Sequence, residues 1–265
     1  MSPDDRQRKE SRLPVPPAQP WGAPAPAPAG PPTKRAAPAI GSRRDLLSVA
    51  IFLLLILGVG IQAYQDLSQP GAWDYWKDRY LSPSMSSSLV DNADLGGRRH
   101  RALVLHGKIG AASASWFRER LDEAHLKAGD LVGMSSLGGD LGQSVIMGEV
   151  VRSRGLATAV GTVDASGRIG PASCASACVF VYAGGKVRFG VEGSRLGVHR
   201  FTTTTAGGDP VADTQRVTGM VLGYLTRMGI SASIVEAMTA TNDIRWLSSQ
   251  EAAAMKLVTD PVRRP

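Results

Sequence analysis

The stretch of this sequence best suited to chemistry surrounds one serine. In GPASCASACVFVYAGG, Ser176 lies midway between Cys174 and Cys178, which are the two cysteines of the chain. Small residues surround the serine, and the apolar run that follows predicts a helix over 177–185. A hydroxyl at the start of such a helix suits acyl transfer, because the unpaired N–H groups there favour a developing negative charge.

Acyl transfer also requires a base and amide groups aimed at the oxyanion. His199 ends the strand-like segment SRLGVHRF and is the best candidate for the base. Gly138 and Gly139, in SSLGGD, follow an earlier predicted strand. Glycines can adopt backbone conformations closed to other residues and admit a carbonyl oxygen closely. The residue types therefore favour an acyl-transfer site assembled from separate strand ends.

The two cysteines admit two interpretations. Residues at i and i+4 of one helix have Cβ atoms about 6 Å apart, which is too far for an unstrained disulfide. A bridge would require Cys174 to lie in the turn before the helix. We favour the other interpretation, in which both are small apolar residues that pack beneath the serine loop. No metal is expected, because two cysteines without a nearby histidine pair fall short of four ligands.

The N-terminal part of the chain has its own organisation. Residues 1–44 hold 11 of the 17 prolines and are expected to form a disordered, proline-rich cytoplasmic tail. Residues 45–65 carry no charge after Asp45 and are long enough to cross a bilayer as a helix. Arg43 and Arg44 precede this segment, which predicts a single inner-membrane crossing with the N-terminus cytoplasmic and the C-terminal domain periplasmic.

Strand-like and helix-like segments alternate in the rest of the chain. Residues 66–97 are expected to be a loop-rich stalk, with the aromatic cluster WDYW at the membrane interface. From Arg98 on, the apolar pattern predicts strands over 102–109, 130–136 and 156–160, and helices over 114–127, 141–154, 210–228 and 231–240. This alternation predicts an α/β domain over 98–265 with a largely parallel sheet. Ser248 and Glu251 predict a capping box for the last helix.

The charge of the domain argues against a nucleic-acid partner. The chain has 265 residues and a net charge of +7, of which residues 1–45 contribute more than half. The folded part is therefore only mildly basic. Nucleic-acid surfaces need clustered Lys and Arg interleaved with stacking aromatics, and the domain shows neither beyond the short run GGRRHR.

Four motifs carry a family resemblance. In order, SSLGGD, CASAC, GVHRF and RWLSSQEAAAMKLVTD resemble the successive motifs of the Clp protease/crotonase superfamily, specifically the Clp proteolytic subunit and the signal peptide peptidase A class. The resemblance is closer still to uncharacterised exported members, and it covers about residues 100–260. It implies a Clp protease/crotonase-like fold of repeated ββα units. It also implies that Ser176 is the nucleophile and His199 the general base, with an oxyanion hole formed by Gly138 or Gly139 and the N–H of Ala177.

The third member of a catalytic triad is where the chain departs from the family. In Clp proteases an aspartate lies two residues before the aromatic of an aromatic-Leu-Ser motif. Here Trp246 is that aromatic, and Ile244 holds the aspartate's place. Asp243, one residue earlier, is the predicted orienting residue, with Asn242 as a weaker substitute. A serine–lysine dyad, as in signal peptide peptidase A, would use Lys186 and is less favoured.

These observations together predict a membrane-anchored periplasmic serine hydrolase. It would be a peptidase that forms an acyl-enzyme on Ser176, acts on a peptide or protein substrate and needs no cofactor. A non-catalytic peptide- or partner-binding module on the same fold is the alternative. An acyl-CoA enzyme of the crotonase type is disfavoured by an exported location with little CoA. The resemblance allows a homo-oligomer, and the polar stretch Thr202–Asp209 is expected to be a solvated loop.

Overall fold

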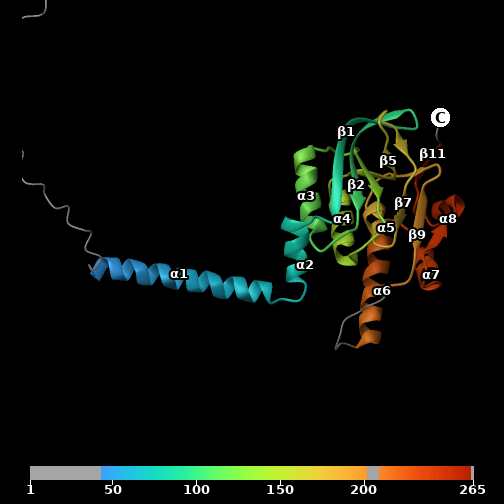
Figure 1. Cartoon of the computed structure of the whole chain (residues 1–265). Coiled ribbons are helices and arrows are strands. Elements are labelled where there is room, and N and C mark those ends of the chain that lie inside the picture. The colour runs from blue at the N-terminus through green and yellow to red at the C-terminus, as the bar shows by residue number, and fades with distance from the viewer. Residues whose placement is uncertain (1–42, 202–208, 264–265) are drawn as a thin grey trace, which may run out of the picture. The chain divides into compact units, whose positions relative to one another are not determined.

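A computed structural model of the chain describes residues 43–201 and 209–263 (Figure 1). Nearly all of the predicted proline-rich tail, 1–44, and most of the predicted loop at 202–209 lie outside the described residues. By its internal contacts the chain divides into two units, 1–58 and 59–265. The second unit contains the sheets and the candidate site.

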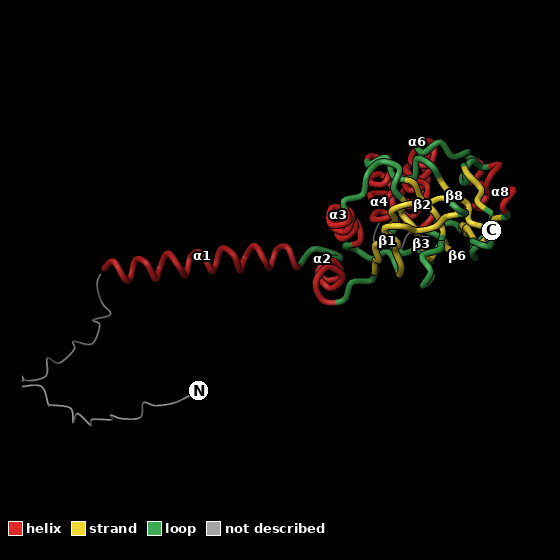
Figure 2. Tube along the Cα trace, turned by 90° about the horizontal axis from the view of Figure 1, so that it is seen from above, coloured by secondary structure: helices red, strands yellow, loops and turns green. Residues whose placement is uncertain are grey.

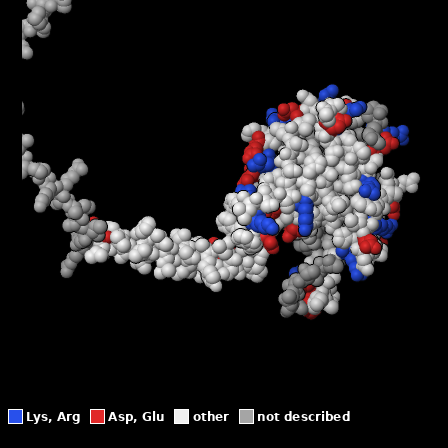
Figure 3. All heavy atoms as spheres, viewed as in Figure 1, with Lys and Arg blue, Asp and Glu red and all other residues white. Residues whose placement is uncertain are grey.

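The helix α1 (Arg43–Leu67) contains the apolar segment predicted at 45–65. Within Asp45–Leu67, an 18-residue window has a mean hydropathy of 2.6, and none of that window is buried. Figure 3 shows its surface almost free of charged side chains. Among the described residues it is the one helix long and apolar enough to cross a membrane. A helix that is apolar all round is typical of a segment surrounded by lipid.

The segment after α1 contains more regular structure than the sequence predicts. The short helices α2 (Ala72–Trp76) and η1 (Lys77–Leu81), the latter a π-helix, precede strand β1 (Met85–Leu95). Strand β1 pairs antiparallel with β2 (Arg98–Gly107) through a turn at Gly96 and Gly97, both with positive φ. The expectation of loop over 66–97 is therefore wrong for β1. The apolar pattern does not identify this strand, because more than half of its residues are polar and it lies at the edge of the sheet.

The main sheet has six strands in the order β1-β2-β3-β4-β8-β11. From β2 onward the neighbouring strands run parallel: β3 (Leu131–Ser135), β4 (Ala157–Val160), β8 (Arg188–Val191) and β11 (Asp260–Val262). Helix α3 (Ser113–Ala124) joins β2 to β3, and α4 (Leu141–Ser153) joins β3 to β4. The predicted α/β architecture with a largely parallel sheet is confirmed.

Both faces of this sheet are buried. Side chains alternate between the two faces along each strand, so neighbouring residues pack into different cores. In β2, Leu103 and Leu105 pack into the larger core with the helices, whereas Ala102 and Val104 belong to a smaller core on the other face. Figure 2 shows α3, α4 and α6 together on one side of the strands. A short hairpin of β5 (Thr162–Val163) and β6 (Ile169–Gly170) contributes Ile169 to the smaller core.

A second sheet carries the candidate site. Its order is β10-β9-β7, with β7 (Ser173–Ala175), β9 (Arg195–Val198) and β10 (Arg245–Leu247). Helix α5 (Cys178–Ala183) follows β7 and has all six residues buried. The remaining helices are α6 (Pro210–Arg227), α7 (Ser233–Thr239) and α8 (Ser249–Ala254). The capping box of Ser248 and Glu251 at the start of α8 is confirmed.

Candidate active site

Ser176 lies in the tight turn between β7 and α5. Only Ser176 and Ala177 separate the last residue of the strand from the first residue of the helix. Ser176 has φ +55, a left-handed conformation that residues with side chains seldom adopt. Its N–H donates to the carbonyl oxygen of Gly197 at 2.9 Å, and its own carbonyl accepts from Val179 N–H at 3.1 Å. Two backbone hydrogen bonds therefore hold the turn in place.

The structure brings Ser176 and His199 into hydrogen-bond contact. His199 Nε2 lies 2.6 Å from Ser176 Oγ, and His199 Nδ1 lies 2.7 Å from the carbonyl oxygen of Arg200. A carbonyl oxygen can only accept, so Nδ1 carries the proton and Nε2 is left to accept from the serine hydroxyl. This is the tautomer in which an imidazole can take a proton from a nucleophile.

Strand pairing explains why these two residues meet. Strands β7 and β9 are parallel neighbours, and Ala175 is paired with Gly197. Ser176 follows the last residue of β7, and His199 follows the last residue of β9. Since the carboxyl ends of parallel strands lie at the same edge of a sheet, residues just past both ends are placed side by side. This is the convergence of strand ends that the sequence predicts.

Asp243 is not brought to His199. The residue is exposed, and in the part of the chain that the structure describes no hydrogen bond or ion pair joins its carboxylate to the imidazole. Asn242 is exposed as well. The carbonyl of Arg200, and not a carboxylate, meets Nδ1. No side-chain signal could have identified this acceptor, because every residue carries a carbonyl.

Ile244, two residues before Trp246, has an apolar role. A Cβ placed on Gly197 would lie 2.5 Å from Ile244 Cγ2 and 2.9 Å from the Trp246 ring. Both side chains therefore pack closely over the backbone that holds Ser176 N–H. Trp246 also lies under the guanidinium of Arg195, whose central carbon is 4.4 Å from the ring centre.

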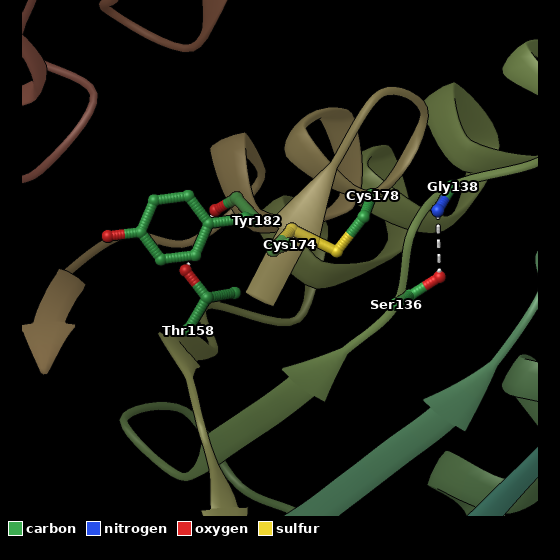
Figure 4. Close-up of a disulfide and its surroundings, with 6 residues drawn as sticks. All are labelled: Ser136, Gly138, Thr158, Cys174, Cys178 and Tyr182. Atoms are coloured by element: carbon green, nitrogen blue, oxygen red, sulfur yellow. Dashed lines mark hydrogen bonds between the residues drawn. A yellow bond between two sulfur atoms is a disulfide. The ribbon is translucent and has the colours of Figure 1, made fainter. Parts of the chain in front are cut away.

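Of the two predicted oxyanion glycines, Gly138 is the one that lies against the serine turn. Its φ is +102, and a Cβ there would lie 2.7 Å from Ser176 Cβ and 2.9 Å from Ala177 N. Its N–H donates to Ser136 Oγ at 3.1 Å (Figure 4). Gly139 has φ +145, and its nearest neighbours are backbone atoms of Ile109 instead.

A hollow of about 470 Å³ adjoins Gly138. It is lined by residues at the ends of three strands: Gly107, Lys108, Ser135, Ser136, Leu137, Gly138, Gly139 and Ser173. Lys108 is the charged member of this lining. Lys186, the lysine of the alternative dyad, is exposed and lies just before β8. Its backbone N–H donates to Leu156 O. No interaction joins Lys186 to Ser176 among the described residues.

Cys174 and Cys178 form a disulfide, with Cα atoms 5.3 Å apart (Figure 4). The preference for two unbridged cysteines is therefore wrong. The physical reason is that Cys174 lies in β7 and only Cys178 lies in the helix, so the i, i+4 geometry of a continuous helix does not apply. Both residues are buried, at 0% and 1% exposure. The bridge spans the serine turn.

Comparisons with known proteins give likenesses of fold only. No protein-family model matches the sequence, and no curated protein matches it. Among solved structures the chain is similar to ClpP1 from Listeria monocytogenes, at 18% sequence identity over 62% of this chain and 92% of that chain, with a TM-score of 0.47. It is similar to an Asn-to-Asp mutant of ClpP1 from the same organism at 16% identity over 62% and 91%, with a TM-score of 0.48.

Proposed function

We propose that this chain is a membrane-anchored serine hydrolase, a peptidase that forms an acyl-enzyme on Ser176. The observation that carries the proposal is the 2.6 Å contact between Ser176 Oγ and His199 Nε2. The hydrogen bond from Nδ1 to the Arg200 carbonyl supports it, because it holds the imidazole in the tautomer of a base. A general base in this position contributes about 10²- to 10⁴-fold to a rate.

The proposed reaction has two steps. In the first, Ser176 Oγ attacks the substrate carbonyl carbon while His199 Nε2 takes the hydroxyl proton. The C–N bond then breaks, and the imidazolium returns that proton to the leaving amine. In the second step water attacks the carbonyl carbon of the acyl-enzyme while His199 Nε2 takes one of its protons. The bond from that carbon to Ser176 Oγ then breaks, the imidazolium returns the proton to Ser176 Oγ, and the carboxylic acid product leaves.

The oxyanion formed in each step needs two amide donors. We assign Gly138 and Ala177, because Gly138 lies against the Ser176 turn and next to the Ala177 amide. The Gly138 N–H must turn from Ser136 Oγ to the substrate oxygen, or share its proton between them. The hollow beside Gly138 is large enough to receive substrate residues.

Membrane anchoring through α1 belongs to the same proposal. The length and hydropathy of α1 are consistent with a single crossing. Arg43 and Arg44 at its start favour a cytoplasmic N-terminus and a periplasmic domain. An alkaline phosphatase fused to the C-terminus tests this orientation, because that enzyme is active only outside the cytoplasm. An inactive fusion of normal abundance would place the domain on the cytoplasmic side.

A non-catalytic peptide-binding module is the second candidate. It is favoured because no acidic side chain among the described residues contacts His199, and a neutral carbonyl stabilises an imidazolium less than a carboxylate does. It is also favoured by the hydrogen bond that engages Gly138 N–H in the free protein.

A fluorophosphonate probe distinguishes the two candidates. In the labelling reaction Ser176 Oγ bonds to phosphorus, fluoride leaves and His199 takes the proton. The full-length protein in detergent micelles should be labelled, Ser176→Ala should not, and His199→Ala should be labelled at least about 100-fold more slowly. Labelling that survives Ser176→Ala removes the proposal, and wild-type protein that stays unlabelled favours the binding module.

A further inference from the structure

The Cys174–Cys178 bridge encloses the proposed nucleophile in a very short loop. Only three residues, 175–177, lie between the two cysteines, and Ser176 is the central one. Cys174 belongs to a strand and Cys178 to a helix, so the bridge ties the two elements on either side of the turn. Figure 4 shows the two sulfur atoms joined between β7 and α5.

The backbone that the bridge encloses is in an unfavourable conformation. Among the described residues only three that are not glycine have positive φ, and Ser176 is one of them. A residue with a Cβ keeps this conformation only where the surrounding structure enforces it. Here three backbone hydrogen bonds contribute: Ala175 N–H to Ser136 O, Ser176 N–H to Gly197 O, and Val179 N–H to Ser176 O. The bridge adds a covalent constraint across the same residues.

Through Cys174, the bridge is also next to β9, the strand that His199 directly follows. Cys174 is paired with Leu196 of β9, and His199 lies three residues beyond Leu196. On its other side the bridge holds the first residue of α5, whose six residues are all buried. A change in the angle between β7 and α5 would move Ser176 Oγ relative to His199 Nε2.

The bridge is poorly placed to stabilise the whole fold. The stabilisation that a disulfide gives by restricting the unfolded chain grows with the length of the loop it closes. This bridge closes a sequence separation of four, so it restricts very little of the unfolded chain. Its main effect must be local, on the turn itself.

We propose that the Cys174–Cys178 disulfide is a positioning bridge for Ser176, so that the reactivity of the serine depends on the oxidised state of the pair. This inference rests on the proposed function of Ser176 as a nucleophile. The two cysteines do not touch the substrate. They act through the turn, whose geometry sets the distance from Ser176 Oγ to His199 Nε2 and to the amides of Gly138 and Ala177.

The test compares wild-type protein with the double variant Cys174→Ala, Cys178→Ala, both full length in detergent micelles. The rate constant for fluorophosphonate labelling of Ser176 should fall at least about tenfold, since a misplacement of about 1 Å costs up to 100-fold. For p-nitrophenyl acetate, kcat should fall by a similar factor. KM should stay within about threefold, because neither cysteine lines the hollow beside Gly138.

A matched control separates positioning from loss of stability. Val181 is 1% exposed in the same helix, and Val181→Ala removes core volume while leaving the bridge intact. This variant should lose thermal stability and keep a labelling rate within about twofold of wild type. A purely structural bridge would instead leave the folded double variant reacting as fast as Val181→Ala, and that result overturns the proposal.

A second measurement covers a double variant that fails to fold. A water-soluble phosphine reduces the wild-type bridge: the disulfide gains two electrons and two protons to give two thiols, and the phosphine becomes its oxide with oxygen from water. Labelling should slow once two thiols per chain are found by alkylation and mass measurement, and should recover on reoxidation with oxidised glutathione. A rate unchanged with both thiols free refutes the positioning role alone. Wild-type protein that is never labelled refutes the proposed function instead.

Discussion

Replacing Gly138 with alanine tests the proposed oxyanion hole, because Gly138 lies directly against the turn that carries Ser176. Gly138 has φ +102, and a Cβ added to it would lie 2.7 Å from Ser176 Cβ, 2.8 Å from Ala175 O and 2.9 Å from Ala177 N. These separations are well below an ordinary carbon contact of about 3.5 Å. The turn that carries Ser176 must therefore move by several tenths of an ångström, or Gly138 must move away from it.

The size of the effect has two parts. A residue with a Cβ in a left-handed conformation costs about 1–2 kcal/mol, so the free energy of unfolding should fall by about that amount or slightly more. Displacing one oxyanion donor costs about 10²- to 10³-fold in rate. For Gly138→Ala we therefore expect kcat at least about 100-fold lower, equal to about 2.7 kcal/mol of transition-state stabilisation.

Gly129 provides the matched control. It has φ +90, no atom lies within 4 Å of the position its Cβ would take, and it is exposed. Gly129→Ala should lose about 1–2 kcal/mol of stability through backbone strain and keep its activity. The assay is the hydrolysis of p-nitrophenyl acetate together with fluorophosphonate labelling, with thermal unfolding measured in parallel. A folded Gly138→Ala protein that reacts as fast as Gly129→Ala would contradict the assignment of Gly138.

Three further predictions concern stability. Arg188 is 3% exposed and donates to the carbonyls of four residues. Arg188→Met should therefore lower the free energy of unfolding, measured by urea titration, by about 3 kcal/mol. Arg227 is exposed, and Arg227→Met should lower it by less than about 1 kcal/mol in the same titration. Tyr224 donates to Phe180 O at 2.7 Å in the core, and Tyr224→Phe should cost about 1 kcal/mol; an unchanged unfolding midpoint would show that this bond contributes nothing net. Hydrogen bonds from Ser248 and then Arg245 hold the pKa of Glu251 at about 2, below its ordinary 4.5. The carboxylate therefore stabilises the fold above about pH 4.5 and loses this effect as the pH falls towards 2, so Glu251→Gln should reduce the acid sensitivity of unfolding between those values.

Regular local patterns made much of the fold predictable. Alternating strand-like and helix-like segments identified β2, β3, β4, α3 and α4 near their observed bounds, because each buries a regular apolar face. Strand β1 had no such pattern. Its residues are mostly polar, and it exists as a strand because β2 offers a free edge to pair with. Pairing with β2 stabilises this strand, and the sequence of β1 alone does not show that pairing.

The candidate site was also only partly predictable from the sequence. From the sequence, Gly138 and Gly139 stayed alternatives, whereas Ser176 and His199 could be selected from residue type, position in the chain and the family resemblance. The acceptor for His199 Nδ1 could not, because it is the main-chain oxygen of Arg200. The cysteine pairing could not either, because it depends on whether the helix begins at Cys178 or before Cys174, a boundary that the apolar run does not define.

By itself the sequence determined the apolar helix, the α/β order of the domain and the residues able to do acyl transfer, because these follow from local apolar spacing and from side-chain chemistry. Only the tertiary structure decided which of those residues meet. The parallel pairing of β7 with β9 brings Ser176 to His199, and Ile244 packs over Gly197, whose carbonyl holds the Ser176 N–H. These contacts join segments that are distant in the chain, so no local sequence pattern predicts them.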